Sequence, residues 1–187
     1  MFTILLQFWG GLFYFLNKLF FAKAERATDL IHRQEWLVRA WIVYLIGIPA
    51  WVIIFITERN WIAATVEASS VPAMLIGLYS ARHGQQAERS WLDHLARLLV
   101  VLGLGLSLYD FGGITAVNQL FELGVAAGFL VGTYMLAKEK SQGYVWLMVG
   151  NISAASLMGV QGYYLLMAQQ LVSLVLVIDA YRIRRQK

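Results

Sequence analysis

The sequence predicts an all-α polytopic membrane protein, with seven transmembrane helices arranged as two parallel three-helix repeats joined by a linker helix. Three observations predict this class. The chain has 187 residues, of which 59% are hydrophobic and 14% charged, a composition typical of membrane proteins. Apolar stretches long enough to cross a bilayer recur along the chain, and its basic residues gather in alternate loops.

The composition also excludes several kinds of site. There is no cysteine, so disulfides and thiolate metal ligands are excluded. The three histidines, His32, His83 and His94, fall in or near predicted loops without metal-ligand spacing. No glycine loop of the Walker type is present. We therefore expect no metal, no cofactor and no ATP hydrolysis, and we do not expect an enzyme.

Seven apolar segments are candidates for spanning helices, at residues 2–22, 36–56, 61–81, 91–109, 115–137, 143–160 and 162–182. The first has neither a basic n-region nor a small-residue cleavage site, so we expect a retained helix and not a signal peptide. The charged segment between the first two, residues 23–35, is compatible with a short helix on the membrane surface or with a solvated loop.

The loop charges predict the orientation of the chain. With the N-terminus outside, the outer loops hold Arg59 as their basic residue. We expect Lys18, Arg39 and Arg97, near inner helix ends, to extend their charged groups toward the interface. The pattern predicts a multi-pass plasma (inner) membrane protein with a cytoplasmic C-terminus, and it argues against nucleic acid as a partner. The inner segments carry Lys23, Arg26, Arg33, Arg82, Arg89, Lys138, Lys140, Arg182, Arg184, Arg185 and Lys187.

Aromatic residues form a stripe along the second helix. Trp41, Tyr44, Trp51 and Phe55 follow one another at spacings that place them on one side of a helix. Such a stripe either packs against neighbouring helices or stacks on a flat ligand ring, with cation–π attraction if the ring is cationic. We include Trp41 and Tyr44 among the candidate ligand-binding residues.

Both prolines of the chain lie inside predicted helices. Pro49 is in the second helix and Pro72 in the third. Because proline removes a backbone hydrogen bond and permits a kink, both are candidate hinges.

Two acidic residues fall within apolar segments. Glu67 lies in the third helix and Glu122 in the fifth. A charge at this depth costs roughly 2.5–3.5 kcal/mol on insertion scales, so each needs a partner, water or a proton. Together they would attract a cation, and Glu67 could carry a proton when no cation is bound.

The fourth and fifth helices differ in character. The fourth has a smooth apolar middle and is expected to be only a connector. The fifth carries Gly124, Gly128 and Gly132, a doubled small-xxx-small pattern that lets another helix approach closely.

The last two helices carry polar groups that lipid disfavours. Tyr144, Met148, Asn151 and Ala155 share one helix face, which suggests the wall of a cavity. The alternative is that such groups only hydrogen-bond between helices. The other polar side chains are Ser153, Ser156, Gln161, Gln169, Gln170, Ser173 and Asp179.

A weak internal repeat relates the first and last three helices. Glu67 corresponds to Gln169, and Tyr79 to Tyr181. Three helices and a linker make an even number of crossings, so both triplets start on the same side and form a parallel repeat. The predicted units are residues 1–82, 83–114 and 115–187, the last ending in a basic tail.

The C-terminal triplet resembles that of the PnuC family of nicotinamide riboside and vitamin transporters. This chain departs from the family in its first half, where Gly47 and Thr57 replace amides and Glu67 stands where Gln is usual. The resemblance rests on Asn151, Gln161, Gly162, Tyr164, Gln169, Asp179 and Arg182, and upstream on Phe121, Glu122 and Lys138.

The resemblance implies a SWEET-like arrangement of three, one and three helices, facilitated diffusion of nicotinamide riboside, trapping by a separate kinase and a homo-oligomer. Thiamine, riboflavin and (deoxy)nucleosides remain alternative ligands. A membrane scaffold or assembly protein remains an alternative of another class. In the transporter, Asn151, Gln161 and Gln169 would hydrogen-bond the ligand. Its ring would stack on Trp41, Tyr44 and Tyr144, and its charge would be balanced by Glu67 and Glu122.

Overall fold

The computed structural model is helical throughout residues 2–57, 59, 61–84, 90–110 and 117–186, the part of the chain that it describes, apart from short turns. Six of the helices are long and apolar enough to cross a membrane, and α3 and α4 are shorter. The elements are α1 (Phe2–Arg26), α2 (Leu30–Thr57), α3 (Trp61–Ala68), α4 (Val71–His83), α5 (Ser90–Asp110), α6 (Val117–Ala137), α7 (Gln142–Val160) and α8 (Tyr164–Gln186).

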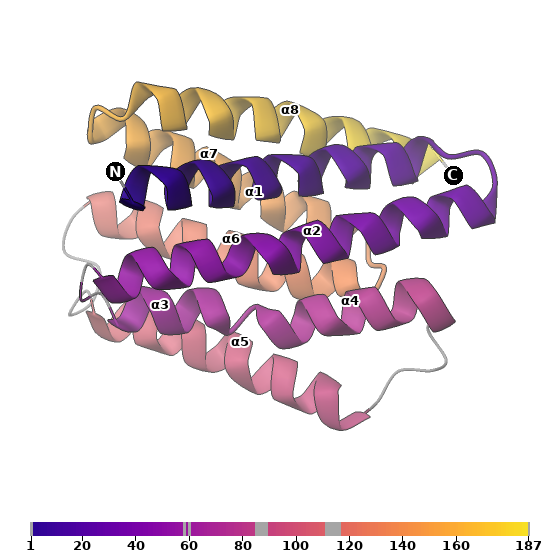
Figure 1. Cartoon of the computed structure of the whole chain (residues 1–187), viewed down its shortest axis with the longest axis horizontal. Coiled ribbons are helices and arrows are strands. Elements are labelled where there is room, and N and C mark those ends of the chain that lie inside the picture. The colour runs from indigo at the N-terminus through magenta and orange to yellow at the C-terminus, as the bar shows by residue number, and fades with distance from the viewer. Residues whose placement is uncertain (1, 58, 60, 85–89, 111–116, 187) are drawn as a thin grey trace.

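The helices pack in a closed ring. α3 and α4 lie end to end, so that together they match the length of one long helix (Figure 1). Each segment packs against the next along the chain, from α1 and α2 through α4, α5, α6 and α7 to α8, and α8 packs back against α1. The inward faces of all these helices therefore form one shared core.

One end of the bundle collects the basic residues. α1, α4, α6 and α8 end there, and α2, α5 and α7 begin there, to the right in Figure 1. Lys23, Arg33, Arg82, Lys138 and Arg184 lie within a few residues of these helix ends. We refer to this as the basic end.

The third predicted helix, residues 61–81, is broken before Pro72. α3 ends at Ala68, and Pro72 lies in the first turn of α4, where its missing N–H breaks no hydrogen bond. Serine hydroxyls at the break donate to carbonyls of the preceding turn, with Ser69 Oγ 2.7 Å from the Thr65 oxygen, which also accepts the Ser69 N–H at 2.9 Å. α2, in contrast, continues through Pro49 without a break.

The segment 23–35 is neither a surface helix nor a long loop. α1 continues to Arg26 and α2 begins at Leu30, so only three residues connect them. Asp29 precedes α2, and its Oδ1 accepts the backbone N–H of His32 at 2.8 Å. This hydrogen bond stabilises the carboxylate and lowers the pKa of Asp29 below its ordinary value.

The small residues of α6 lie against α7. A Cβ on Gly128 would fall 2.3 Å from the backbone nitrogen of Gly150, and one on Gly132 would fall 2.9 Å from the Leu147 side chain. One on Gly124 would meet the Ser153 hydroxyl. The glycine stripe therefore forms a close helix–helix contact within the chain.

Candidate functional site

A cluster of polar and aromatic side chains fills the middle of the ring, and we call it the central cluster. Lys18 Nζ on α1 lies 3.3 Å from Asn17 Oδ1 and 5.0 and 5.7 Å from the ring centroids of Tyr44 and Phe129. The Tyr44 hydroxyl lies 3.2 Å from Thr133 Oγ1 on α6. Its members are Asn17, Lys18, Tyr44, Phe129, Thr133 and Asn151, from four helices.

Lys18 does not reach the membrane interface. The prediction that it extends its charge toward an inner helix end is wrong, because only 5% of the residue is exposed. The neighbouring Asn17 is fully buried and donates from Nδ2 to the Ala40 carbonyl at 3.1 Å. Sequence reasoning missed this pair, although two consecutive polar residues inside an apolar helix were a visible signal.

Asn151 is fully buried on α7. Its Nδ2 donates to the Leu147 carbonyl, one turn earlier in the same helix, at 2.6 Å. Its Oδ1 has no hydrogen-bond partner within the described part of the chain. Gly150, the preceding residue, lies against the Phe129 ring, so this turn of α7 approaches α6 at the level of the central cluster.

The aromatic stripe of α2 faces this interior. Tyr14 meets the Tyr44 ring edge-on at 5.0 Å and the Trp51 ring at 6.1 Å. The Tyr14 hydroxyl and Trp51 Nε1 are buried without hydrogen-bond partners among the described residues. The Trp41 and Tyr44 rings are stacked, with 6.4 Å between their centroids. The Trp41 indole also lies so close to Gly77 that a Cβ on that residue would overlap it.

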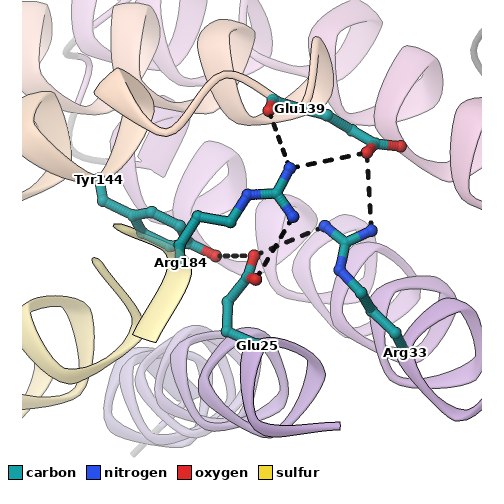
Figure 2. A network of polar contacts seen from close by, with 5 residues as sticks. All are labelled: Glu25, Arg33, Glu139, Tyr144 and Arg184. Atoms are coloured by element: carbon teal, nitrogen blue, oxygen red, sulfur yellow. Dashed lines mark hydrogen bonds and ion pairs between the residues drawn. The ribbon is translucent and has the colours of Figure 1, made fainter. Parts of the chain in front are cut away.

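A charged network closes the basic end of the bundle (Figure 2). Glu25, 3% exposed, accepts a hydrogen bond from the Tyr144 hydroxyl at 2.9 Å. Its oxygens lie 3.7 Å from Arg33 and 3.6 Å from Arg184. Glu139 lies 3.6 Å from Arg33 and 3.9 Å from Arg184, so two carboxylates and two guanidinium groups alternate.

Glu139 occupies an unusual backbone position in this network. Its φ is +54°, in the left-handed region that favours glycine. The N–H of Lys140 bonds the Met135 carbonyl at 2.9 Å, which makes the end of α6 a Schellman motif with Glu139 where glycine is usual. A side chain at this position therefore implies a use for its carboxylate.

The network is held loosely. Its ion pairs of 3.6–3.9 Å are longer than hydrogen bonds, and neither Glu25 Oε2 nor Arg33 Nε has a hydrogen-bond partner among the described residues. A cavity of about 20 Å³ lies inside it, lined by Glu25, Arg33 and Tyr144 among others, which is room for about one water molecule. Opening this closure would separate these long ion pairs and break two hydrogen bonds, from Tyr144 to Glu25 at 2.9 Å and from Arg184 to the Glu139 carbonyl at 3.3 Å.

The network and the central cluster occupy successive levels of the same core. α1 and α7 are antiparallel, and Glu25 on α1 touches Tyr144 on α7. Seven residues farther from the basic end, which is two helical turns, these helices carry Lys18 and Asn151. Of the cavity wall predicted from Tyr144 and Asn151, Tyr144 therefore belongs to the charged network and Asn151 lies at the level of the central cluster.

The other predicted ligand residues lie elsewhere. Gln161 is the exposed C-cap of α7, and Gly162 after it has a φ of +79°, so this pair ends a helix. Gln169 Nε2 donates to the Gly11 carbonyl at 3.1 Å and joins α8 to α1. Glu67 on α3 and Glu122 on α6 are half-buried, and neither contacts Lys18.

A second hollow lies outside the central cluster. It is an open groove of about 540 Å³ between α1 and α8. Its lining is apolar except for Gln7 and Gln169, and includes Ile4, Phe8 and Val172, which are exposed. Exposed apolar surface on a helix of spanning length suits contact with lipid chains better than with a polar ligand.

α5 is more than an apolar connector. Asp93, buried near its start, lies 2.6 Å from Arg97 and 2.7 Å from Lys138, and its Oδ1 accepts the Tyr134 hydroxyl at 2.8 Å. These contacts fasten α5 to α6 at the basic end.

Comparison with protein-family models, with curated proteins and with solved structures found no match to this chain. The arrangement of its own residues is therefore what bears on its function. Among the described residues, no group of three histidine, aspartate or glutamate side chains is placed to hold a metal ion.

Proposed function

We propose that this protein is a membrane transporter that imports a small, flat, water-soluble nutrient by facilitated diffusion. The ligand would bind at the central cluster, between the Tyr44 and Phe129 rings and Asn151. By the resemblance to the PnuC family, nicotinamide riboside, thiamine, riboflavin and nucleosides are the candidate ligands, and a separate cytoplasmic kinase would trap the product. The membrane is the plasma (inner) membrane, with the C-terminus in the cytoplasm.

One observation carries this proposal. Five side-chain atoms are buried without hydrogen-bond partners in the described part of the chain, and all belong to the core of the ring or to the network that closes it. Buried polar groups in proteins are nearly always paired, and in a membrane core each unpaired one costs several kcal/mol. A polar ligand passing through the core would supply partners for Tyr14, Trp51 and Asn151.

The network at the basic end gives this transporter an inner gate. Glu25 and Arg33 come from the first triplet of helices, and Glu139, Tyr144 and Arg184 from the last part of the chain. In the proposed mechanism the two triplets, a parallel repeat, rock about the core, and the ion pairs between them separate to open the cytoplasmic side. The break between α3 and α4 beside Pro72 is the proposed hinge.

The scaffold alternative has less support. It would use the glycine face of α6 for partner helices, but Gly124, Gly128 and Gly132 lie against α7 of the same chain. A scaffold also has no use for unpaired polar atoms in its own core.

A thermal-shift screen of the purified protein tests ligand binding. We expect one compound among nicotinamide riboside, thiamine, riboflavin and nucleosides to raise the Tm, because a ligand that binds only the folded state stabilises it by about 2.7 kcal/mol at 100 times its Kd. Asn151→Ala should abolish the shift.

The matched control is Ile152→Ala, which alters an exposed residue next to Asn151 and should keep the shift. Indifference of the wild type to every compound would favour the scaffold. A shift retained in Asn151→Ala would place the ligand elsewhere.

A further inference from the structure

An ammonium group without a carboxylate partner lies in the core of the ring. Lys18 is 5% exposed, and its interactions within the described chain are with Asn17 Oδ1 and with the rings of Tyr44 and Phe129. A charge buried at this depth is costly unless it is paired. Lys18 therefore differs from Arg33 and Arg184 at the basic end, each of which has an acidic partner in Glu25.

Among the described residues, the groups around Lys18 come from four helices, and none of them supplies a negative charge. α2 contributes Tyr44 and α6 contributes Phe129 and Thr133, while α7 places Asn151 at the same level. On α1 the buried acid, Glu25, is two turns away.

Glu25 is already engaged by Tyr144, Arg33 and Arg184. Its charge is therefore balanced within the network and does not compensate Lys18.

Lys18 also has unused hydrogen-bonding capacity. A lysine ammonium has three N–H donors, and the structure gives Lys18 one acceptor, Asn17 Oδ1. At the same level Asn151 Oδ1 lacks a donor. The core of the described chain thus offers unused N–H donors on Lys18 and an unused acceptor on Asn151, at the level of the Tyr44 and Phe129 rings.

We propose that Lys18 sets the charge preference of the transported ligand, which is a heterocycle of zero or negative net charge with a carbonyl or carboxylate acceptor and not a ligand of net positive charge. This inference rests on the proposed function. A ligand acceptor would bind the ammonium, a ligand N–H would bind Asn151, and the ring would lie against Tyr44 and Phe129. A ligand of net positive charge at the same place, with no carboxylate to pair with the ammonium, would meet the Lys18 charge at close range in a medium of low dielectric constant, where repulsion is strong.

The test compares two ligands of the same size and different charge. Nicotinamide riboside is a cation, and nicotinic acid riboside carries a carboxylate that makes it neutral overall. Uridine serves as an uncharged ring with adjacent carbonyl and N–H groups. Binding of each is titrated on the full-length protein by thermal shift, with Lys18→Met as the variant and Lys18→Arg as the control that keeps the charge.

We expect the wild type to bind nicotinic acid riboside or uridine at least tenfold more tightly than nicotinamide riboside. Lys18→Met should remove most of that preference, and Lys18→Arg should still bind nicotinic acid riboside or uridine more tightly than nicotinamide riboside. Tighter binding of the cation by the wild type would overturn the inference but leave the transporter intact, even if the variants do not fold. A preference unchanged in a folded Lys18→Met would also overturn the inference. A protein that responds to no ligand would overturn the proposed function, and this inference with it.

Discussion

Replacing Glu25 with alanine should lower the stability of the protein by about 3 kcal/mol, because removing one carboxylate from a buried ion-pair network leaves two guanidinium groups to share the remaining one, Glu139. Arg33 and Arg184 would face each other across the closed end of the bundle, with side chains only 14% and 25% exposed. At about 2–4 °C per kcal/mol, the Tm should fall by roughly 6–12 °C. Thermal unfolding of the purified protein measures this directly.

Two further variants calibrate that result. Glu25→Gln should cost less, since its amide oxygen still accepts the Tyr144 hydroxyl. Arg26→Gln breaks an ion pair with Asp179 at the same end, but the Arg26 side chain is 64% exposed, so the loss should stay below about 1 kcal/mol. Equal Tm values for Glu25→Ala and Arg26→Gln would show that the network contributes nothing to holding this end closed.

Gly128→Ala should destabilise the contact between α6 and α7 by about 3 kcal/mol, the upper end of the usual cost of overpacking. The added methyl would fall 2.3 Å from the Gly150 nitrogen and 2.4 Å from its Cα. These atoms are backbone, so the helices must separate to admit it. We expect a loss of Tm or of folded yield, measured by thermal unfolding and size-exclusion chromatography.

The matched control changes the same residue type where there is room. A Cβ on Gly105 of α5 meets nothing within 4 Å, and alanine is about 1 kcal/mol better than glycine inside a helix. Gly105→Ala should therefore leave the Tm unchanged or raise it. An unchanged or raised Tm for Gly128→Ala would contradict the close approach of α6 and α7.

The helical membrane class was predictable from composition and hydropathy, but details of the helices were not. The break between α3 and α4 depends on Ser69 and Ser70 taking up carbonyl hydrogen-bonding capacity, which the apolar pattern does not reveal. Pro49 and Pro72 look alike in the sequence, yet only Pro72 follows a break.

The candidate site was predictable in part. Tyr44 and Asn151 were selected because aromatic and amide groups are unusual at membrane depth, and both lie in the central cluster. Lys18 was assigned to the inner interface because it lies near a helix end, and Glu25 fell within the charged segment 23–35, which was expected to be a surface helix or a solvated loop. Distance along one helix cannot tell which side of it faces the core, because that depends on neighbours remote in sequence, such as Phe129 and Arg184.

The central claim is that a small molecule crosses the membrane through the core of this bundle. Counterflow into proteoliposomes tests it most directly, with the ligand found by thermal shift loaded inside and its labelled form outside, without ATP or an ion gradient. The account predicts transient accumulation of label, reduced at least tenfold in Asn151→Ala and retained in Ile152→Ala. Label uptake no greater than in empty liposomes would contradict it.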